Sequence, residues 1–337
     1  MGCTPGSLCG LAHDPYDFRR ERELVMGPWI MLVTDAIFGD PLSIPHPVIG
    51  IGKIITWWEK RWYGERAQRV RGFCFLISVL ATTGFLAYLI HLSIRNFAGG
   101  WILESMVCGW FLATKSLVGV GDQMTRIFQV EGIRGARKQV GNFVSRDTDQ
   151  LTESDVLRAT IETMAENVVD GVISPICFYY LGMILGSPLV GIVFYKSINT
   201  LDSMVGYRNK RYGRFGTASA RLDDFANWLP ARLSAGLILV AGGLTGGKFA
   251  RGWRIMKRDR HLHDSPNSAY AEASMAGVYG CKLGGPASYF GIREERPWIG
   301  QGLSDPTWDL LNRVKCNVWV SQILFVGLVE GGRLIWG

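Results

Sequence analysis

The apolar run from Gly72 to Leu92, GFCFLISVLATTGFLAYLIHL, constrains the fold of this chain more than any other feature, because it contains no Asp, Glu, Lys or Arg. At a rise of about 1.5 Å per residue, a helix of this length crosses a hydrocarbon layer about 30 Å thick. The residues just before it, WWEKRWYGERAQRVR, mix aromatic and basic side chains as the cytoplasmic border of a membrane helix does. The run therefore predicts a membrane-spanning helix. The alternative is a soluble protein in which this flank forms a basic surface helix.

The composition of the whole chain favours a membrane protein with polar loops. Its 337 residues include 12 Trp, and the charged fraction of 19% is below the roughly 25% that is typical of soluble domains. The net charge of +7 comes from basic residues that flank apolar runs and form no single stripe. We therefore expect lipid and phosphate as anionic partners, and no nucleic acid. The seven cysteines include no CxxC pair, which argues against a zinc site or a disulfide framework.

Other apolar segments are less regular. A second span is predicted from Trp101 to Gly121, and it contains Glu104 and Lys115, so we expect it to face protein more than lipid. Two segments are short for a crossing, which indicates re-entrant or buried helices, and a third is interrupted by an acid. These three segments are Leu233–Gly247, Cys316–Val329 and, with Asp35 inside it, Leu24–Phe38.

The uncharged stretch from Gly171 to Tyr195 has basic residues on both sides. A single crossing would place one basic cluster outside the cell, against the positive-inside rule. The Gly-Ser-Pro sequence at 186–188 breaks the helical pattern midway. We therefore expect a helical hairpin that enters the membrane and returns, with both basic loops on the cytoplasmic side.

The predicted fold class is an all-α polytopic integral membrane protein with transmembrane and re-entrant or buried helices. Residues 1–23 are polar without an apolar signal-peptide region, and they are interpreted as a flexible tail. Residues 24–337 are predicted to form a single membrane-embedded helical domain. Its polar cytoplasmic loops, at 122–167, 199–232 and 250–315, are expected to hold the chemistry.

One near match to a nucleotide-binding motif is rejected. GGLTGGKF, at 242–249, fits a P-loop except that Phe249 stands where a Ser or Thr should bind Mg²⁺. The segment also follows an apolar run of helical character, whereas a P-loop follows a strand. Lys248 is therefore interpreted as an interfacial anchor.

A column of acids enters the membrane segment in RATIETMAENVVDGVISP, residues 158–175. Residues four apart share one helix face, so Glu162, Glu166 and Asp170 stack with Arg158 and repel one another. Either a cationic group neutralises them or the face is solvated. Just upstream, Thr152 is predicted to cap the helix with Asp155 as its partner.

Further polar residues lie at the borders of the apolar segments, in SRDTDQL (145–151), KSINTLDSMVGYRN (196–209), SARLDDFANWLPARL (219–233) and SPNSAYAEASMAG (265–277). Any one of them is most simply a solvated loop charge or a surface ion pair, worth at most about 1 kcal/mol. Acids beside amides and arginines at three such borders favour a binding site, because burying such groups is costly unless they are paired. The last block also supplies Glu272.

These blocks, together with DAIFGDPLSIPHPVIGIGKII (35–55) and RPWIGQG (296–302), occur in the order and approximate spacing of the CobD/CbiB family. The chain resembles this adenosylcobinamide-phosphate synthase family of cobalamin biosynthesis over about residues 30 to 330. Gln301 stands where many relatives have an acid, which puts a role for that position in doubt. Two alternatives stay open: an AmpE-like regulatory or sensor membrane protein without ligase activity, and a transporter. The intact ETMAENVVDG and NTLDSMVGYRN blocks favour the enzyme, and charges at span ends disfavour the transporter.

The resemblance implies an ATP- and Mg²⁺-dependent amide ligation. It would join (R)-1-amino-2-propanol O-phosphate, or a similar amino alcohol, to the propionate of adenosylcobyric acid, so that the corrinoid is a substrate. The implied location is the cell membrane, with several crossings and the active site on the cytoplasmic side. A homo-oligomer or contact with other cobalamin-assembly enzymes is left open.

Roles are then assigned by residue type. Mg²⁺ binds through one or two carboxylates plus phosphate oxygens, and phosphoryl transfer needs cations that neutralise charge. The metal candidates are Glu166, Asp170, Asp223 and Asp224. The catalytic candidates are Glu162, Glu166, Asp170 and Asp202, with Glu162 or Asp202 accepting the amine proton. The phosphate clamps are Lys196, Arg208, Arg221 and Arg232. The orienting amides are Asn167, Asn199 and Asn209. The remaining substrate-binding candidates are Arg146, Asp147, Asp149, Tyr207 and Asn267.

Overall fold

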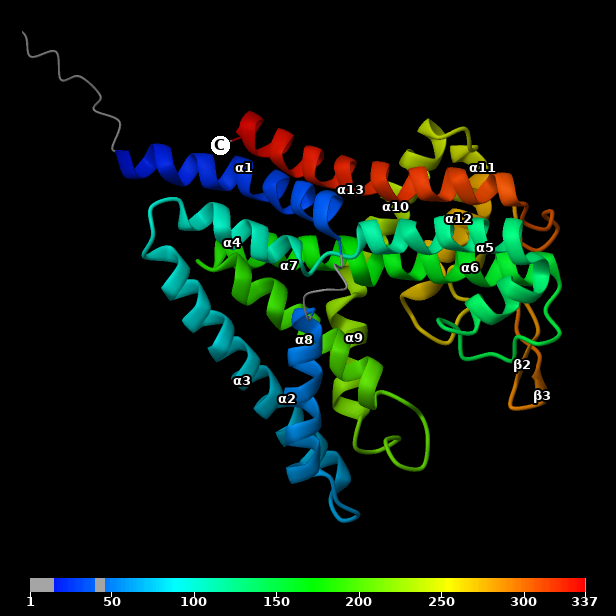
Figure 1. The fold of residues 1–337 in the computed structure, drawn as a ribbon, viewed down its shortest axis with the longest axis horizontal. Helices are drawn as coiled ribbons and strands as arrows, with labels where there is room; N and C mark the ends of the chain where they lie inside the picture. The colour runs from blue at the N-terminus through cyan, green and yellow to red at the C-terminus, as the bar shows by residue number, and fades with distance from the viewer. Residues whose placement is uncertain (1–14, 40–45, 337) are drawn as a thin grey trace, which may run out of the picture.

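The computed structural model describes residues 15–39 and 46–336, and it is almost entirely helical, as predicted (Figure 1). The helices are α1 (Pro15–Phe38), α2 (Pro47–Trp62), α3 (Gln68–Arg95), α4 (Gly100–Gly109), α5 (Thr114–Val140), α6 (Glu153–Val168), the π-helix η1 (Val169–Ile173), α7 (Ser174–Ile184), α8 (Pro188–Val205), α9 (Thr217–Ala226), α10 (Trp228–Leu244), α11 (Phe249–Asp259), α12 (Ser268–Tyr279) and α13 (Trp308–Trp336). Four short strands form two antiparallel pairs, β1 (Leu283–Gly284) with β4 (Trp298–Ile299) and β2 (Ala287–Tyr289) with β3 (Ile292–Glu294).

Within the described residues, 4 helical segments are long and apolar enough to cross a membrane, or up to 5 if the bent pair α9 and α10 counts as one span. The segments are 68–95, 100–140, 153–184 and 308–335. The predicted span Gly72–Leu92 lies inside α3. Cys316–Val329, which looks too short in the sequence, is the middle of the long helix α13. Leu233–Gly247 belongs mostly to α10, which meets α9 at a bend of 43°.

The predicted second span, Trp101 to Gly121, is interrupted between α4 and α5 at residues 110–113, within the segment 100–140. Glu104 is buried, as expected. Lys115 is exposed instead, and its Nζ donates to the carbonyl of Ile37 at 2.6 Å. The expectation that both charged side chains are covered by protein therefore holds for Glu104 and not for Lys115.

The chain from 171 to 195 forms a helical hairpin, as predicted, while its placement in the membrane stays a prediction. Ser187 caps α8 by accepting a hydrogen bond from Val190 N at 3.2 Å, and α7 and α8 pack against each other. The close approach depends on two glycines: a Cβ on Gly182 would lie 2.9 Å from the Cα of Gly191. A side chain at either position would push the helices apart. The first arm of the hairpin continues from α6 through η1, so the acid column lies on one long helix, 153–184.

Two predictions about polar segments need correction or extension. Of the expected tail, residues 1–14 lie outside the described residues, whereas residues 15–23 begin helix α1. The helix-forming Arg and Glu residues of this stretch explain why the helix starts there. The expected loops contain helices α9, α11 and α12. The capping box of Thr152 and Asp155 is present at the start of α6, as predicted.

The overall shape separates two regions (Figure 1). Helices α2 and α3 pack together and project as an arm, while α5, α6 and α13 run side by side in the body. The β2–β3 hairpin lies at the end of the body that is distant from α1. The largest hydrophobic core runs from α1 to α13 and buries residues such as Met31, Ile161 and Val318 completely.

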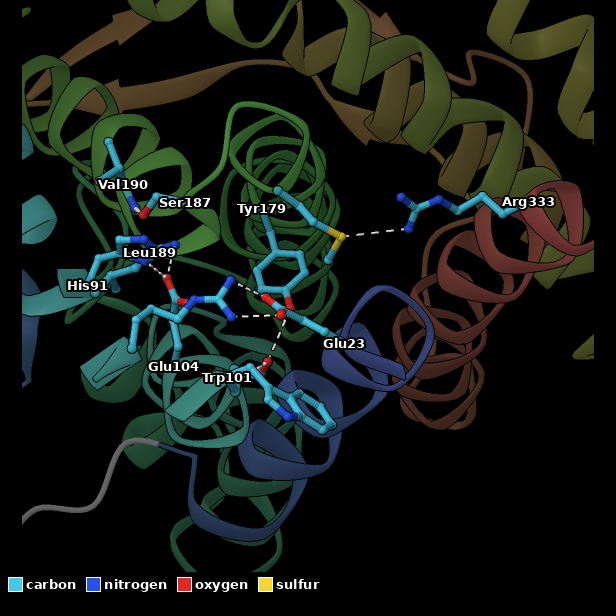
Figure 2. A network of polar contacts seen from close by, with 12 residues as sticks. Glu23, His91, Trp101, Glu104, Tyr179, Ser187, Leu189, Val190 and Arg333 are labelled. Carbon is cyan, nitrogen blue, oxygen red and sulfur yellow. Dashed lines mark hydrogen bonds and ion pairs between the residues drawn. The ribbon is translucent and has the colours of Figure 1, made fainter. Parts of the chain in front are cut away.

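A buried polar network joins the ends of several apolar helices (Figure 2). One carboxylate oxygen of Glu104 lies 2.7 Å from His91 Nδ1 and accepts from Leu189 N at 3.2 Å, and the other lies 3.1 Å from Arg95 Nε. Arg95 also forms a two-point ion pair with Glu23. This network ties α1, α3 and α4 to the start of α8. The opposite end of α8 carries candidate site residues.

Candidate functional site

Two neighbouring cavities open where the acid column leaves the apolar core. The larger, about 710 Å³, lies between α6, α12 and the strands, and the smaller, about 450 Å³, lies between η1, α8, α9 and the start of α12. Glu166, His263 and Asp264 line both. The two cavities are therefore adjoining compartments of one polar cleft, with Glu166 between them.

Glu162 is held by cations and by a backbone amide. Its carboxylate pairs with Arg146, accepts a hydrogen bond from Gly284 N at 2.6 Å, and lies 3.8 Å from Arg158 Nε. Arg158 also pairs with Asp155 at 2.9 Å. The first acid of the column is thus neutralised by the protein itself.

Glu166, one turn later, is much less engaged. Its carboxylate accepts one hydrogen bond, from the hydroxyl of Ser268 at 3.0 Å, at the first residue of α12. Because it faces both compartments, this carboxylate is available to a ligand in either one.

Asp170 follows on η1, where the chain departs from α-helical hydrogen bonding. The N–H of Ser174 bonds Val169 O, and Pro175 has no N–H, so the carbonyl of Asp170 has no donor from the next turn. That carbonyl accepts instead from Lys196 Nζ at 3.2 Å and from Tyr195 OH at 3.3 Å, both on α8. The π turn therefore fixes η1 to α8 at the wall of the smaller compartment.

Four predicted carboxylates line the smaller compartment together with Glu166, namely Asp170, Asp202, Asp223 and Asp224. Burial raises the pKa of Asp202, and the neighbouring charges of Asp224 and Glu166 add to the rise. Asp223 accepts from Asn227 Nδ2 at 3.0 Å through one oxygen. Its other oxygen is buried without a hydrogen bond, with Asn199 close enough to interact. The compartment concentrates negative charge.

Groups that favour anions face the same compartment. Arg208 and Tyr207 line it, and the charge of Arg208 acts on Asp224. The N-terminal end of α12 lies here as well, with Asn267 donating to Asp224 O at 2.9 Å. Arg232 reaches Asn267 Oδ1 at 3.5 Å. Helix N-termini and arginines attract phosphate, whereas the carboxylates attract cations. This mixture suits a metal-bound anion.

The larger compartment holds Glu272, which is buried at 4% exposure. Burial raises the pKa of Glu272 well above its usual value, and the charges of Glu162 and Glu166 raise it further, while Arg146 and Arg296 oppose the rise. The compartment therefore brings acids on α6 and α12 together with arginines from the segments at 146 and 296.

Several predicted residues lie outside both compartments, and their roles stay predictions. Asn167 bonds Thr163 O on its own helix at 2.8 Å. Asn209 accepts from Arg211 N and Tyr212 N, which shapes its loop. Asp147 accepts from Phe290 N at 3.1 Å and Gly291 N at 2.8 Å, which fixes the tip of the β2–β3 hairpin. Asp149 and Arg221 also lie outside and are exposed. Lys196, Asn199 and Arg232 line neither compartment, although Lys196 donates to Asp170 O, Asn199 acts on Asp223 and Arg232 reaches Asn267.

Sequence reasoning did not name several cleft residues as site residues, among them Asp264, Glu272, His263, Arg296 and Asn227. His263 and Arg296 occur in irregular segments without any recognisable spacing. Asn227 lies at the α9–α10 bend, where it accepts from Ser174 at 2.6 Å and Tyr195 at 3.0 Å. The signal for Asn227 was its place in the polar SARLDDFANW block.

The chemistry of the smaller compartment fits Mg²⁺. Across residues 15–39 and 46–336, no three His, Cys, Asp or Glu side chains are grouped closely enough to form a metal site by themselves. Mg²⁺ does not need such a group, because one or two carboxylates plus phosphate and water oxygens complete its shell. The buried, unbonded oxygen of Asp223 beside Asp170 is of the required type.

The near P-loop lies elsewhere. Gly242 to Leu244 end helix α10, and Lys248 precedes α11, with its backbone N–H bonded to Val278 O at 2.8 Å. A helix and not a strand precedes the motif. Gln301, the position that departs from the family pattern, accepts from Arg258 through its carbonyl at 3.3 Å and lines neither compartment.

The fold and the cleft define a class: an all-α, multi-pass membrane protein with a polar cleft of carboxylates and arginines at the ends of its apolar helices. The family model described as CobD/Cbib protein matches residues 29–315, and the chain belongs to this family.

Curated relatives agree with this assignment. The chain is 40% identical over 313 residues to the cobalamin biosynthesis protein CbiB of Salmonella typhimurium, which covers 90% of this chain and 96% of the relative. It is 40% identical to the cobalamin biosynthesis protein CobD of Klebsiella pneumoniae, and the alignment covers 90% of this chain and 95% of the relative. It is 39% identical to the cobalamin biosynthesis protein CobD of Citrobacter koseri, and the alignment covers 91% of this chain and 96% of the relative. No solved structure matches the chain significantly.

Proposed function

We propose that this protein is an adenosylcobinamide-phosphate synthase. It uses ATP to join (R)-1-amino-2-propanol O-phosphate, or a similar amino alcohol, to the propionate of adenosylcobyric acid. Family membership and relatives named for cobalamin biosynthesis support the pathway. The observation that supports the chemistry is the position of Glu166, a lightly bonded carboxylate that lines both compartments.

The smaller compartment is suited to the nucleotide. Asp170 and Asp223 would hold Mg²⁺, which neutralises phosphate charge during phosphoryl transfer. Arg208 and the N-terminus of α12 face the same space and would bind phosphate oxygens. Asn227 orients Asp223 and is itself fixed by Ser174 and Tyr195.

The larger compartment is suited to the nucleophile. A carboxylate becomes an acyl donor when a phosphoryl group is transferred to it, and an amine then attacks the acyl carbon and releases phosphate. The attacking ammonium must lose a proton first. Glu166 is better placed to accept it than Glu162, because Arg146 and Gly284 N already occupy the Glu162 carboxylate. The cytoplasmic side of the membrane is the proposed location, since ATP is found there.

The test is a reconstituted reaction. Protein purified in detergent is incubated with adenosylcobyric acid, aminopropanol phosphate and Mg-ATP, and the amide product is measured by mass spectrometry. We expect product that requires ATP, the amine and protein with an intact Asp223. Absence of amide from folded protein under all of these conditions would refute the ligase and favour an AmpE-like membrane protein without ligase activity.

A further inference from the structure

Glu272 lines the larger compartment without a partner in the described part of the chain. It is 4% exposed, and it forms no hydrogen bond or ion pair with residues 15–39 or 46–336. An ionised carboxylate buried in this way is costly unless a cation reaches it. Without such a cation the raised pKa favours the protonated carboxyl group, and a ligand that carries a positive group would stabilise the ionised form.

The surroundings of Glu272 show why its own arginines do not meet that need. Arg146 is bound to Glu162, and Arg296 lies over the ring of Tyr289 at 4.8 Å and 3.5 Å from Glu294. Both act on Glu272 only through space. The other charges that face it are the acids Glu162 and Glu166 on α6, which repel its negative charge.

We propose that the larger compartment is the subsite for the amino-alcohol phosphate, with the ammonium group bound by Glu272 and the phosphate turned toward Arg146 and Arg296. This inference rests on the proposed function. A small molecule with one ammonium and one phosphate matches a cavity that is lined by both acids and arginines. The arrangement places the amine beside Glu166, at the border of the compartment that is suited to the nucleotide.

In this subsite Glu272 binds an ammonium group, whereas the acids of the smaller compartment are suited to a metal ion. The acids there surround a helix N-terminus and Arg208, which suits a metal-bound anion. Glu272 lies on α12 and lines only the larger cavity, whereas Asp202 and Asp223 line only the smaller one. Removal of its charge should therefore weaken binding of the amine and leave binding of the nucleotide unchanged.

The experiment compares two probes by isothermal titration calorimetry without ATP. The first is (R)-1-amino-2-propanol O-phosphate, and the second is 2-propyl phosphate, which lacks the amine. Glu272→Gln should weaken binding of the first probe about 10- to 100-fold, the range expected for loss of one charged hydrogen bond. Binding of the second probe should stay within about twofold. Glu295→Gln is the matched control, because it removes the same charge from an exposed rim position of the same cavity and should leave both affinities within about twofold.

Glu272→Asp is the second variant, because it keeps the charge on a shorter side chain. It should retain the preference of the wild-type protein for the amine-bearing probe, and it replaces Glu272→Gln as the reporter if the amide variant does not fold. Equal loss of both probes in Glu272→Gln would show a structural role and overturn the inference. Unchanged affinity for the amine, or a wild-type protein that binds the two probes alike, would overturn it as well.

The outcome is separable from that of the proposed function. If the wild-type protein forms the amide while Glu272→Gln keeps its affinity for the amine, only the subsite is refuted. If the wild-type protein binds the amine through Glu272 but forms no amide under any condition of the reconstituted assay, the subsite stands and the ligase assignment fails.

Discussion

Glu162 and Glu166 lie one turn apart on the same helix, and the structure predicts opposite consequences for the same change. Glu162→Gln removes a charge that pairs with Arg146, where the two side chains are 11% and 13% exposed. Removal of one partner of a buried ion pair costs about 3–5 kcal/mol, because the other charge stays buried and unpaired. The amide oxygen can still accept from Gly284 N, so we expect a loss of free energy of unfolding of about 3 kcal/mol.

Glu166→Gln should behave differently. The hydrogen bond from Ser268 is the interaction at risk, and one such bond contributes about 1 kcal/mol. The change also removes repulsion with Asp202 and Glu272, which offsets that loss. Stability should therefore change by less than about 1 kcal/mol, while turnover falls by about 10²- to 10⁴-fold, the usual contribution of a general base.

The assay measures both quantities on the same preparations. Thermal unfolding in one detergent gives the stability of the wild-type protein, Glu162→Gln and Glu166→Gln, and amide formation is measured at a temperature where all three are folded. The reasoning is refuted if Glu166→Gln loses activity only in proportion to lost stability, or if Glu162→Gln melts like the wild-type protein.

Three further changes test other parts of the structure, and a labelling experiment tests the topology. Glu104→Gln should lower the free energy of unfolding by about 3–5 kcal/mol, since Glu104 joins His91 and Arg95 inside the core, and an unchanged melting temperature would contradict this. Without ligand, the wild-type protein should lose stability as pH rises from about 4.5 through the raised pKa of Glu272. The melting temperature of Glu272→Gln should therefore exceed that of the wild-type protein by a difference that grows with pH. A difference that stays constant with pH would contradict this prediction. Lys248→Ala should keep turnover within several-fold of the wild-type value, whereas a loss of about 10³-fold would indicate that residues 242–249 are a true P-loop. Cysteines placed at 137 and 210 should be labelled from the same, cytoplasmic side, and labelling from opposite sides would refute the hairpin topology.

The long helices could be predicted because apolar runs and their flanking charges are local signals. Helix α3 shows this most clearly. Helix α13 was underestimated because charges border its apolar segment, and the structure shows that they find partners: Lys315 pairs with Asp122 on α5, and Arg333 with Glu330 on its own helix. Such partners lie far along the chain or on the helix face, so a count of uncharged residues cannot anticipate them.

The candidate site could be predicted by composition but not by arrangement. The sequence places acids, amides and arginines at the borders of apolar segments, and most of them line the two compartments. It does not indicate that Gly284 N meets Glu162, or that Ser268 meets Glu166, because each of these contacts closes a loop of more than a hundred residues. The residues that decide which acid is neutralised therefore lie outside the motif that contains the acids.

The three acids of the column are evenly spaced in the sequence but lie in three different environments, and these environments determine which acid is available to a ligand. Glu162 is neutralised by Arg146, Glu166 is bound only by a hydroxyl, and Asp170 follows a change of helix type. The π turn before Pro175 changes the backbone hydrogen bonding at Asp170, but the Asp170 side chain still lines the smaller compartment together with Glu166. Repulsion along the column is thus relieved by a cation at its start, whereas Asp170, at its end, still repels Glu166 across the smaller compartment. Glu166 is left between them as the carboxylate most available to a ligand, at the border of both compartments.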